Sequence, residues 1–261
     1  MKLKLTLITS ILFLVLPVFG QRYMEPPKEI MDVLNAPAIP STSISPSRDR
    51  IALLVPLRYP PISELAQPML RIAGLRINPN SNSQHRQPYF VGLTLKTISN
   101  GKEMPIALPA NAQIFSPLWS PDGKYLAFGN ITPVGVELWI LDAAAGKLQK
   151  VKNVYLNTAF GGFSWENSLT LTAMLVPAKR GPAPQYQNLT PTEPNIQETS
   201  GRSGAVQTFQ DLMKSPNDER LFEYYCTSQP AVIDASGRVR EVGPTAIYND
   251  FEFSPDGKYM L

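Results

Sequence analysis

Ser120-Pro-Asp-Gly-Lys-Tyr-Leu126, near the middle of the chain, recurs close to its end as Ser254-Pro-Asp-Gly-Lys-Tyr-Met260. Each copy directly follows an aromatic residue, Trp119 or Phe253. In such a stretch proline sets φ, the aspartate side chain caps the turn, and glycine takes a positive φ. The motif therefore predicts a tight turn that leads into an apolar strand.

Two weaker copies extend this series. Ile44-Ser-Pro-Ser-Arg-Asp-Arg-Ile51 keeps the Ser-Pro pair, and Phe163-Ser-Trp-Glu-Asn-Ser-Leu169 keeps the aromatic-Ser start. Pro121 and Pro255 are 134 residues apart, which we interpret as three periods of about 45 residues. Aligning the serines of the first strong copy and of the second weak copy gives a spacing of 44 residues.

A second series has the same period. Thr97–Lys102, Leu141–Lys147 and Ile233–Arg238 each place a glycine turn after an apolar strand. The glycines of the first two are 45 residues apart, and those of the last two are 91 apart, close to two periods. Strands are expected at 125–128, 136–141 and 148–151, with the Gly146 hairpin turn between the last two.

A unit of about 45 residues with four strands is one blade of a β-propeller. The alternative is a β-sandwich whose turns coincide by chance, and two series with one period favour the propeller. We predict an all-β, incomplete propeller over 42–261 with four to five blades. Its last blade would stop in mid-strand at Leu261 and expose an unpaired edge, so residues 21–261 are expected to fold poorly alone.

Several segments interrupt this rhythm. Residues 177–225 are expected to form a loop and helix insertion, with one helix over 208–215 and another from Ser215. Residues 60–80 interrupt the first blade. Before the blades, 21–41 form an N-terminal arm that contains a short amphipathic helix at 26–34.

Residues 1–20 have the three parts of a secretory signal peptide: Lys2 and Lys4, an apolar run over 5–18, and small residues before Gln21. The alternative is a membrane anchor, but the run of roughly 14 residues is shorter than the roughly 20 that a spanning helix needs. We therefore expect an exported protein, periplasmic or extracellular, with no membrane contact after cleavage.

The charges and the reactive side chains exclude several classes of function. The net charge is +3, and basic residues nowhere form a run longer than Lys179-Arg180, so no nucleic-acid partner is expected. Cys226 is the one cysteine, interpreted as a buried apolar residue or as the partner of a cysteine beyond Leu261. His85 is the one histidine, and Gly-x-Ser-x-Gly does not occur, so no catalytic residue is assigned. No metal and no cofactor are predicted, because the sequence has neither metal-ligand spacing nor a phosphate loop.

Stretches in the irregular segments closely resemble the glutamyl endopeptidase branch of the prolyl oligopeptidase family of serine peptidases. They are Pro26–Ile30, Leu34–Pro40, Ser63–Ala66, Leu75–Ile77, Thr208–Leu212, Leu221–Tyr225 and Ala231–Gly243. The resemblance implies an N-terminal propeller followed by an α/β-hydrolase domain. The catalytic Ser, Asp and His would then all lie beyond Leu261, and the propeller would restrict access to peptides and unfolded segments.

The resemblance also implies cleavage after glutamate, whose carboxylate would suit a bidentate arginine. Arg76 and Arg86 are the candidate substrate-binding residues, and Arg180 and Arg202 lie in similar segments. The alternative for each is a solvated surface charge. At the level of the whole chain, the rival hypotheses are a stand-alone exported propeller that binds a ligand or protein without catalysis and, more weakly, a decayed, naturally truncated copy.

Overall fold

The computed structural model describes residues 25–185, 201, 209–254 and 259–260. Its contacts divide the chain into two units, Met1–Pro37 and Ala38–Leu261, each described by itself. The first contains helix α2 (Lys28–Leu34), as predicted for 26–34. None of the helices in the described ranges is long and apolar enough to cross a membrane.

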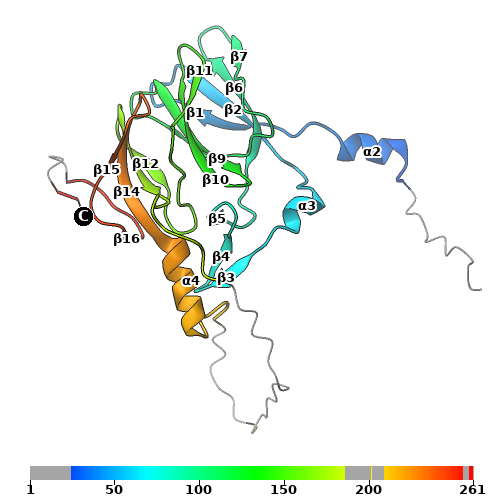
Figure 1. Cartoon of the computed structure of the whole chain (residues 1–261). Coiled ribbons are helices and arrows are strands. Elements are labelled where there is room, and N and C mark those ends of the chain that lie inside the picture. Colours follow the sequence, from blue (N-terminus) through cyan, green and yellow to red (C-terminus); the bar gives the residue numbers. More distant parts are fainter. Residues whose placement is uncertain (1–24, 186–200, 202–208, 255–258, 261) are drawn as a thin grey trace, which may run out of the picture. The chain divides into compact units, whose positions relative to one another are not determined.

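The second unit contains antiparallel sheets of eight, five and three strands. The eight-stranded sheet consists of two four-stranded meanders joined through one residue pair, Phe90 with Ile114, and the five-stranded sheet adds β16 (Ala246–Ile247) to a third four-stranded meander. We call these three meanders blades 1 to 3 (Figure 1). Blade 1 contains β1 (Ser41–Ile44), β2 (Arg50–Pro56), β6 (Phe90–Thr97) and β7 (Glu103–Pro105). Blade 2 contains β8 (Ile114–Trp119), β9 (Tyr125–Thr132), β10 (Gly135–Asp142) and β11 (Lys147–Lys150). Blade 3 contains β12 (Phe163–Asn167), β13 (Thr170–Leu175), β14 (Thr227–Asp234) and β15 (Val239–Glu241). The all-β, incomplete propeller is confirmed, and no closed ring of blades is seen in the described part of the chain.

The quoted motif forms the turn between the first two strands of blade 2. Ser120 Oγ donates to Asp122 Oδ1 (2.8 Å) and accepts from the Tyr125 amide (3.0 Å). Gly123 has φ +72°, the left-handed conformation that the turn requires. In blade 1 the weaker copy makes the same turn, because Ser45 Oγ accepts from the Arg50 amide at 3.1 Å. The residue before the capping aspartate there, Arg48, adopts φ +57°.

The hydrophobic cores lie between blades. Strand β9 shows this most directly, since Leu126 and Phe128 pack toward blade 1 while Ala127 packs toward blade 3. All three side chains are fully buried. A strand with both faces buried loses the alternation of apolar and polar residues, as the Tyr-Leu-Ala-Phe stretch does. Each blade is therefore stabilised by its neighbours.

Indole hydrogen bonds link the first strands of successive blades. Trp119 Nε1 at the end of β8 donates to Ser43 Oγ of β1 (3.1 Å). In the next blade, Trp165 Nε1 of β12 donates to the Leu118 carbonyl of β8 (3.0 Å). Each of these bonds joins a blade to the preceding one, through Trp119 directly before the Ser-Pro turn in blade 2 and through Trp165 in blade 3.

The blade count predicted from spacing was too high. The residues that the structure describes form three complete blades rather than four to five, and a bridge between Phe253 and Met260 begins a further element. The 134 residues from Pro121 to Pro255 contain the rest of blade 2, blade 3 and an insertion between β13 and β14. This insertion is about as long as one blade. The interpretation of the 134 residues as three repeats was therefore wrong, because it counted the insertion as a blade. The spacing of 45 residues between Gly101 and Gly146 does mark successive blades.

Two insertions follow the second strands of their blades. The blade 1 insertion contains α3 (Ile62–Leu65), β3 (Leu70–Ile72), β4 (Leu75–Asn78) and β5 (Ser83–Gln84). The blade 3 insertion ends in α4 (Pro216–Cys226), and β16 (Ala246–Ile247) pairs with the start of β14.

The helix predicted over 208–215 is wrong for the residues described there, 209–215, which are not helical. Phe209 and Leu212 are exposed in that segment. The physical reason is Pro216, which disfavours helical backbone at the preceding residue. Ser215 is accordingly extended, and its side chain caps α4 by accepting from the Asp218 amide, so the second predicted helix is confirmed.

Candidate functional site

Both insertions lie on one face of the propeller, because each connects the second and third strands of its blade. In a four-stranded meander, the first-to-second and third-to-fourth turns lie at one end of the strands. The second-to-third connections and the links between blades lie at the other end. Both insertions are second-to-third connections, and Figure 1 shows β3, β4, β5 and α4 gathered at one end of the sheets. We call this end the insertion face.

An apolar cluster packs the two insertions against each other. Leu70, Ile72 and Ile77 of the blade 1 insertion are buried with Leu221 and Tyr225 of α4. Cys226 belongs to the same cluster and is fully buried, and burial raises the pKa of its thiol to about 12. This supports the apolar interpretation of Cys226, since a neutral buried thiol is a poor nucleophile.

A buried amide pair locks the insertions to the link between blades 2 and 3. Asn157, in that link, is fully buried, and its Nδ2 donates to the carbonyls of Tyr225 (2.9 Å) and Thr227 (3.0 Å). Its Oδ1 accepts from Asn82 Nδ2 (2.6 Å) and from the Ala159 amide (3.2 Å). One side chain therefore makes four hydrogen bonds, of which those with Asn82 and with the Tyr225 carbonyl reach the two insertions.

Arg180 reaches the same network from the start of the blade 3 insertion. Its Nη1 donates to Asn82 Oδ1 (2.5 Å) and to the Tyr224 carbonyl (3.2 Å). The guanidinium carbon lies 4.0 Å from the centre of the Tyr224 ring, a cation–π contact. The position of this cation is thus set by both insertions together.

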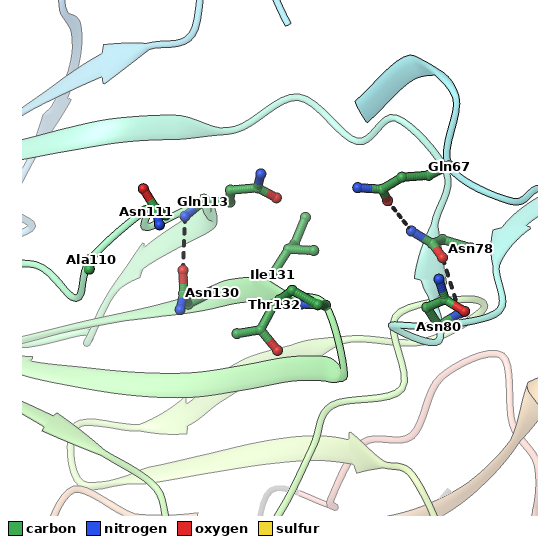
Figure 2. Close-up of a pocket in the computed structure, with 10 residues that line it drawn as sticks. Gln67, Asn78, Asn80, Ala110, Asn111, Gln113, Asn130, Ile131 and Thr132 are labelled. Atoms are coloured by element: carbon green, nitrogen blue, oxygen red, sulfur yellow. Dashed lines mark hydrogen bonds between the residues drawn. The ribbon is translucent and has the colours of Figure 1, made fainter. Parts of the chain in front are cut away.

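A polar cavity of about 350 Å³ opens where the blade 1 insertion meets blade 2 (Figure 2). Figure 2 shows Gln67, Asn78 and Asn80 on one side and Asn111, Gln113 and Asn130 on the other. Internal hydrogen bonds hold some of these amides, such as Asn78 Nδ2 to Gln67 Oε1 (2.5 Å). None of the lining residues is ionisable. Amides both donate and accept, so the cavity suits a neutral polar group such as a peptide backbone and cannot transfer protons.

A hydrogen-bond and ion-pair network around Glu137 holds Asn130 in the wall of this cavity. Asn130 Nδ2 donates to Glu137 (3.2 Å), which also accepts from Trp139 Nε1 (2.8 Å) and pairs with Lys150. Burial raises the pKa of Glu137, but the hydrogen bonds from Lys150, Trp139 and Asn130 outweigh burial and leave the pKa below its ordinary value. Glu137 therefore stays ionised and acts as a fixed acceptor for the cavity wall.

The four arginines singled out from the sequence differ in their surroundings. Arg76 on β4 pairs with Asp211 (Nε to Oδ2, 3.7 Å) and also donates to Gln210 (3.5 Å). Arg86 is exposed at the edge of a smaller, proline-rich cavity of about 270 Å³. Arg202 lies outside the described residues, and Arg180 joins the buried network described above. Arg76 and Arg180 both bridge the two insertions, Arg76 through an ion pair with Asp211 and Arg180 through neutral partners among the described residues. This difference in counter-ion is a tertiary property, which the sequence does not show.

His85 does not form part of a catalytic arrangement in the described chain. Its Nε2 lies 3.2 Å from the backbone carbonyl oxygen of Gln67, at the base of the blade 1 insertion. A catalytic histidine would instead contact a nucleophile on one ring nitrogen and an acid on the other. The described residues also contain no group of three or more His, Cys, Asp or Glu side chains that could hold a metal ion.

Comparison with known proteins gives a sequence match along nearly the whole chain. A protein from Oryza sativa subsp. japonica named "Probable glutamyl endopeptidase, chloroplastic" is 37% identical over 254 residues, which are 92% of this chain and 27% of that protein. A protein of the same name from Arabidopsis thaliana is 35% identical over 260 residues, with 93% and 27% covered. The chain is therefore similar in sequence to proteins named as glutamyl endopeptidases. It spans about a quarter of the length of these two relatives, and the predicted resemblance is confirmed.

More distant similarities concern solved structures. A prolyl endopeptidase is 14% identical with a TM-score of 0.42, covering 86% of this chain and 25% of that chain. The propeller domain of the Trilobed protease from Pyrococcus furiosus is 12% identical with a TM-score of 0.34, covering 78% and 43%. No protein-family model matches the chain.

Proposed function

We propose that this chain is the substrate-gating propeller portion of a secreted serine peptidase that cleaves after glutamate. The observation that supports the proposal most strongly is the match of 92% of the chain to a quarter of a glutamyl endopeptidase. The rest of such a protein has room for the α/β-hydrolase domain that would supply the catalytic Ser, Asp and His.

The topology supports a specific arrangement of the two domains. A blade with four strands begins and ends on the same face, which here is the insertion face. A domain attached in sequence to the propeller would therefore start at that face and meet both insertions. Peptides passing to it would meet the amide-lined cavity and the Arg180 network, while a folded protein would be too bulky to pass. The peptide partner and the hydrolase domain are thus assigned to one side of the propeller.

The decisive experiment begins with the coding DNA past Leu261 and continues with the full-length product. We expect an open frame that encodes Gly-x-Ser-x-Gly, then Asp, then His. The purified product should cleave a short peptide after its single glutamate and leave the same segment uncut inside a folded domain. A stop codon directly after Leu261, together with a product that hydrolyses no peptide, refutes the peptidase function and favours a stand-alone binding propeller.

Secretion is a separate part of the proposal, supported by the three-part pattern of residues 1–20, which lie outside the described residues. Both plant relatives are named chloroplastic, so their names give no support for export. Mass spectrometry of the natural protein should find an N-terminus at Gln21 in the periplasmic or culture fraction. Recovery of an uncleaved N-terminus from the cytoplasm would refute this part alone.

A further inference from the structure

Arg180 is a half-buried cation that makes no ion pair with any described residue. Its two hydrogen bonds, to Asn82 Oδ1 and to the Tyr224 carbonyl, both leave from Nη1 and end on neutral acceptors. Arg76, in the other insertion, is by contrast paired with Asp211. A partly desolvated charge is costly unless a counter-ion joins it. The Arg180 guanidinium is therefore held in position by neutral groups, but no described residue neutralises its charge.

The unused edge of Arg180 has the shape of a carboxylate receptor. A guanidinium carries five N–H donors in a planar fork, and here Nε and Nη2 make no hydrogen bond to the described residues. Those two nitrogens can hold both oxygens of one carboxylate through parallel hydrogen bonds. The contact of the guanidinium with the Tyr224 ring at 4.0 Å restrains the fork before any ligand arrives.

The surroundings of Arg180 provide space and a favourable field. A pocket of about 520 Å³ is lined by Arg180 together with Lys179 and Arg220, and Glu223 is the one acidic residue among its lining residues. Three cations against one acid attract an anion. Pro177 and Tyr224 add apolar surface that suits the methylene groups next to a side-chain carboxylate.

We propose that this pocket, which we call the Arg180 pocket, binds a carboxylate of a peptide, with Arg180 as the bidentate partner. This deepens the proposed function, because it names the chemical group of a peptide that the insertion face holds. The carboxylate comes either from an acidic side chain or from the C-terminus of the peptide. Both sources present the same two oxygens to the same fork.

The test measures calorimetric binding of short peptides to the full-length product, independently of hydrolysis. The probes are acetyl-Ala-Glu-Ala-amide, its Gln analogue, and the Gln analogue with a free C-terminal carboxylate. Each has an N-methylated bond after the central residue, so that cleavage does not occur. The variants are Arg180→Met, Arg180→Lys and Asn82→Ala, with Arg71→Met as the matched control, because Arg71 is an exposed arginine on β3 of the blade 1 insertion. Circular dichroism verifies that each variant is folded.

We expect at least one carboxylate probe to bind about tenfold or more tightly than the neutral amide, and Arg180→Met to abolish that difference. Arg180→Lys should retain only part of it, because an ammonium lacks the fork. Arg71→Met should stay within about twofold of the unmodified protein, because Arg71 is exposed and does not line this pocket. Asn82→Ala keeps the cation and should keep preference for the charged probe, which separates loss of charge from loss of the surrounding structure.

Whichever of the two carboxylate probes binds identifies the source of the carboxylate. Equal binding of all three probes, or unchanged preference in a folded Arg180→Met variant, overturns the inference. Hydrolysis is measured separately, with the unmethylated glutamate peptide and the full-length product. Arg180-dependent binding without that hydrolysis counts against the peptidase function alone, while hydrolysis after glutamate without Arg180-dependent binding counts against this inference alone.

Discussion

Replacing Asn157 by alanine should lower the free energy of unfolding by about 3–4 kcal/mol. The side chain is fully buried and uses both of its donors and both lone pairs of its oxygen. Alanine would leave the Thr227 carbonyl and the Ala159 amide without this partner, while the Tyr225 carbonyl would keep its bond from Asn82 at 3.2 Å. Each buried group left unsatisfied costs about 1–3 kcal/mol, and groups in one network do not add fully.

The assay is urea unfolding of the full chain, followed by tryptophan fluorescence, with the change in midpoint multiplied by the slope of the transition. Asn100→Ala is the matched control, because Asn100 is exposed and its Oδ1 accepts one local bond, from the Lys102 amide at 2.9 Å. That control should lose no more than about 0.5 kcal/mol. If Asn157→Ala lost as little as the control, the buried network would not hold the insertions and this reasoning would fail.

Three further substitutions test the packing and electrostatics of the blades by the same urea assay. Trp165→Phe removes the 3.0 Å hydrogen bond to the Leu118 carbonyl of β8 and should lower the free energy of unfolding by about 1–2 kcal/mol, with Trp119 left in place as the internal reference. No loss would mean that the hydrogen bond between the first strands is dispensable. Gly129→Ala places a Cβ 2.1 Å from the ring of Phe115, so overpacking should lower stability by about 1–3 kcal/mol, and a neutral result would show that the ring moves freely. Glu137→Gln concerns pH: the lowered pKa of Glu137 contributes stability above its ordinary value of 4.5, and this contribution is lost as pH falls through the folded-state value. The variant should therefore lose less stability than the unmodified chain between pH 7 and pH 3.5, and equal losses would contradict the sign.

The repeats were sufficient to predict the blades because the turn chemistry is local. Ser120, Asp122 and Gly123 are close in sequence and bond to one another, so the same letters form the same turn wherever they occur. The copy at Ser45 shows how far this holds, since Arg48 adopts the positive φ without being glycine. The blade count failed for a different reason, because an insertion of one blade's length is invisible to a spacing argument.

The candidate site depended on contacts that are distant in sequence. Asn82 and Asn157 are 75 residues apart, and Arg180 is 98 residues from Asn82, yet they form one network. In the sequence, Arg76 and Arg180 look equivalent, because each is an arginine in an irregular segment. Their environments in the folded chain differ: Asp211 forms an ion pair with Arg76, whereas Arg180 is held by neutral groups among the described residues.

By itself the sequence determined the local chemistry of this protein: the Ser-Pro turns, the glycine hairpins, the cap of the helix at Ser215 and the resemblance to glutamyl endopeptidases. These features follow from interactions between residues close in sequence, or from sequence similarity, and do not depend on the tertiary structure. Only the tertiary structure decided that both insertions share one face, and that a cation with no ion-pair partner among the described residues lies where they meet. Strand parity and burial produce that outcome, and both are properties of the folded chain rather than of any segment of it.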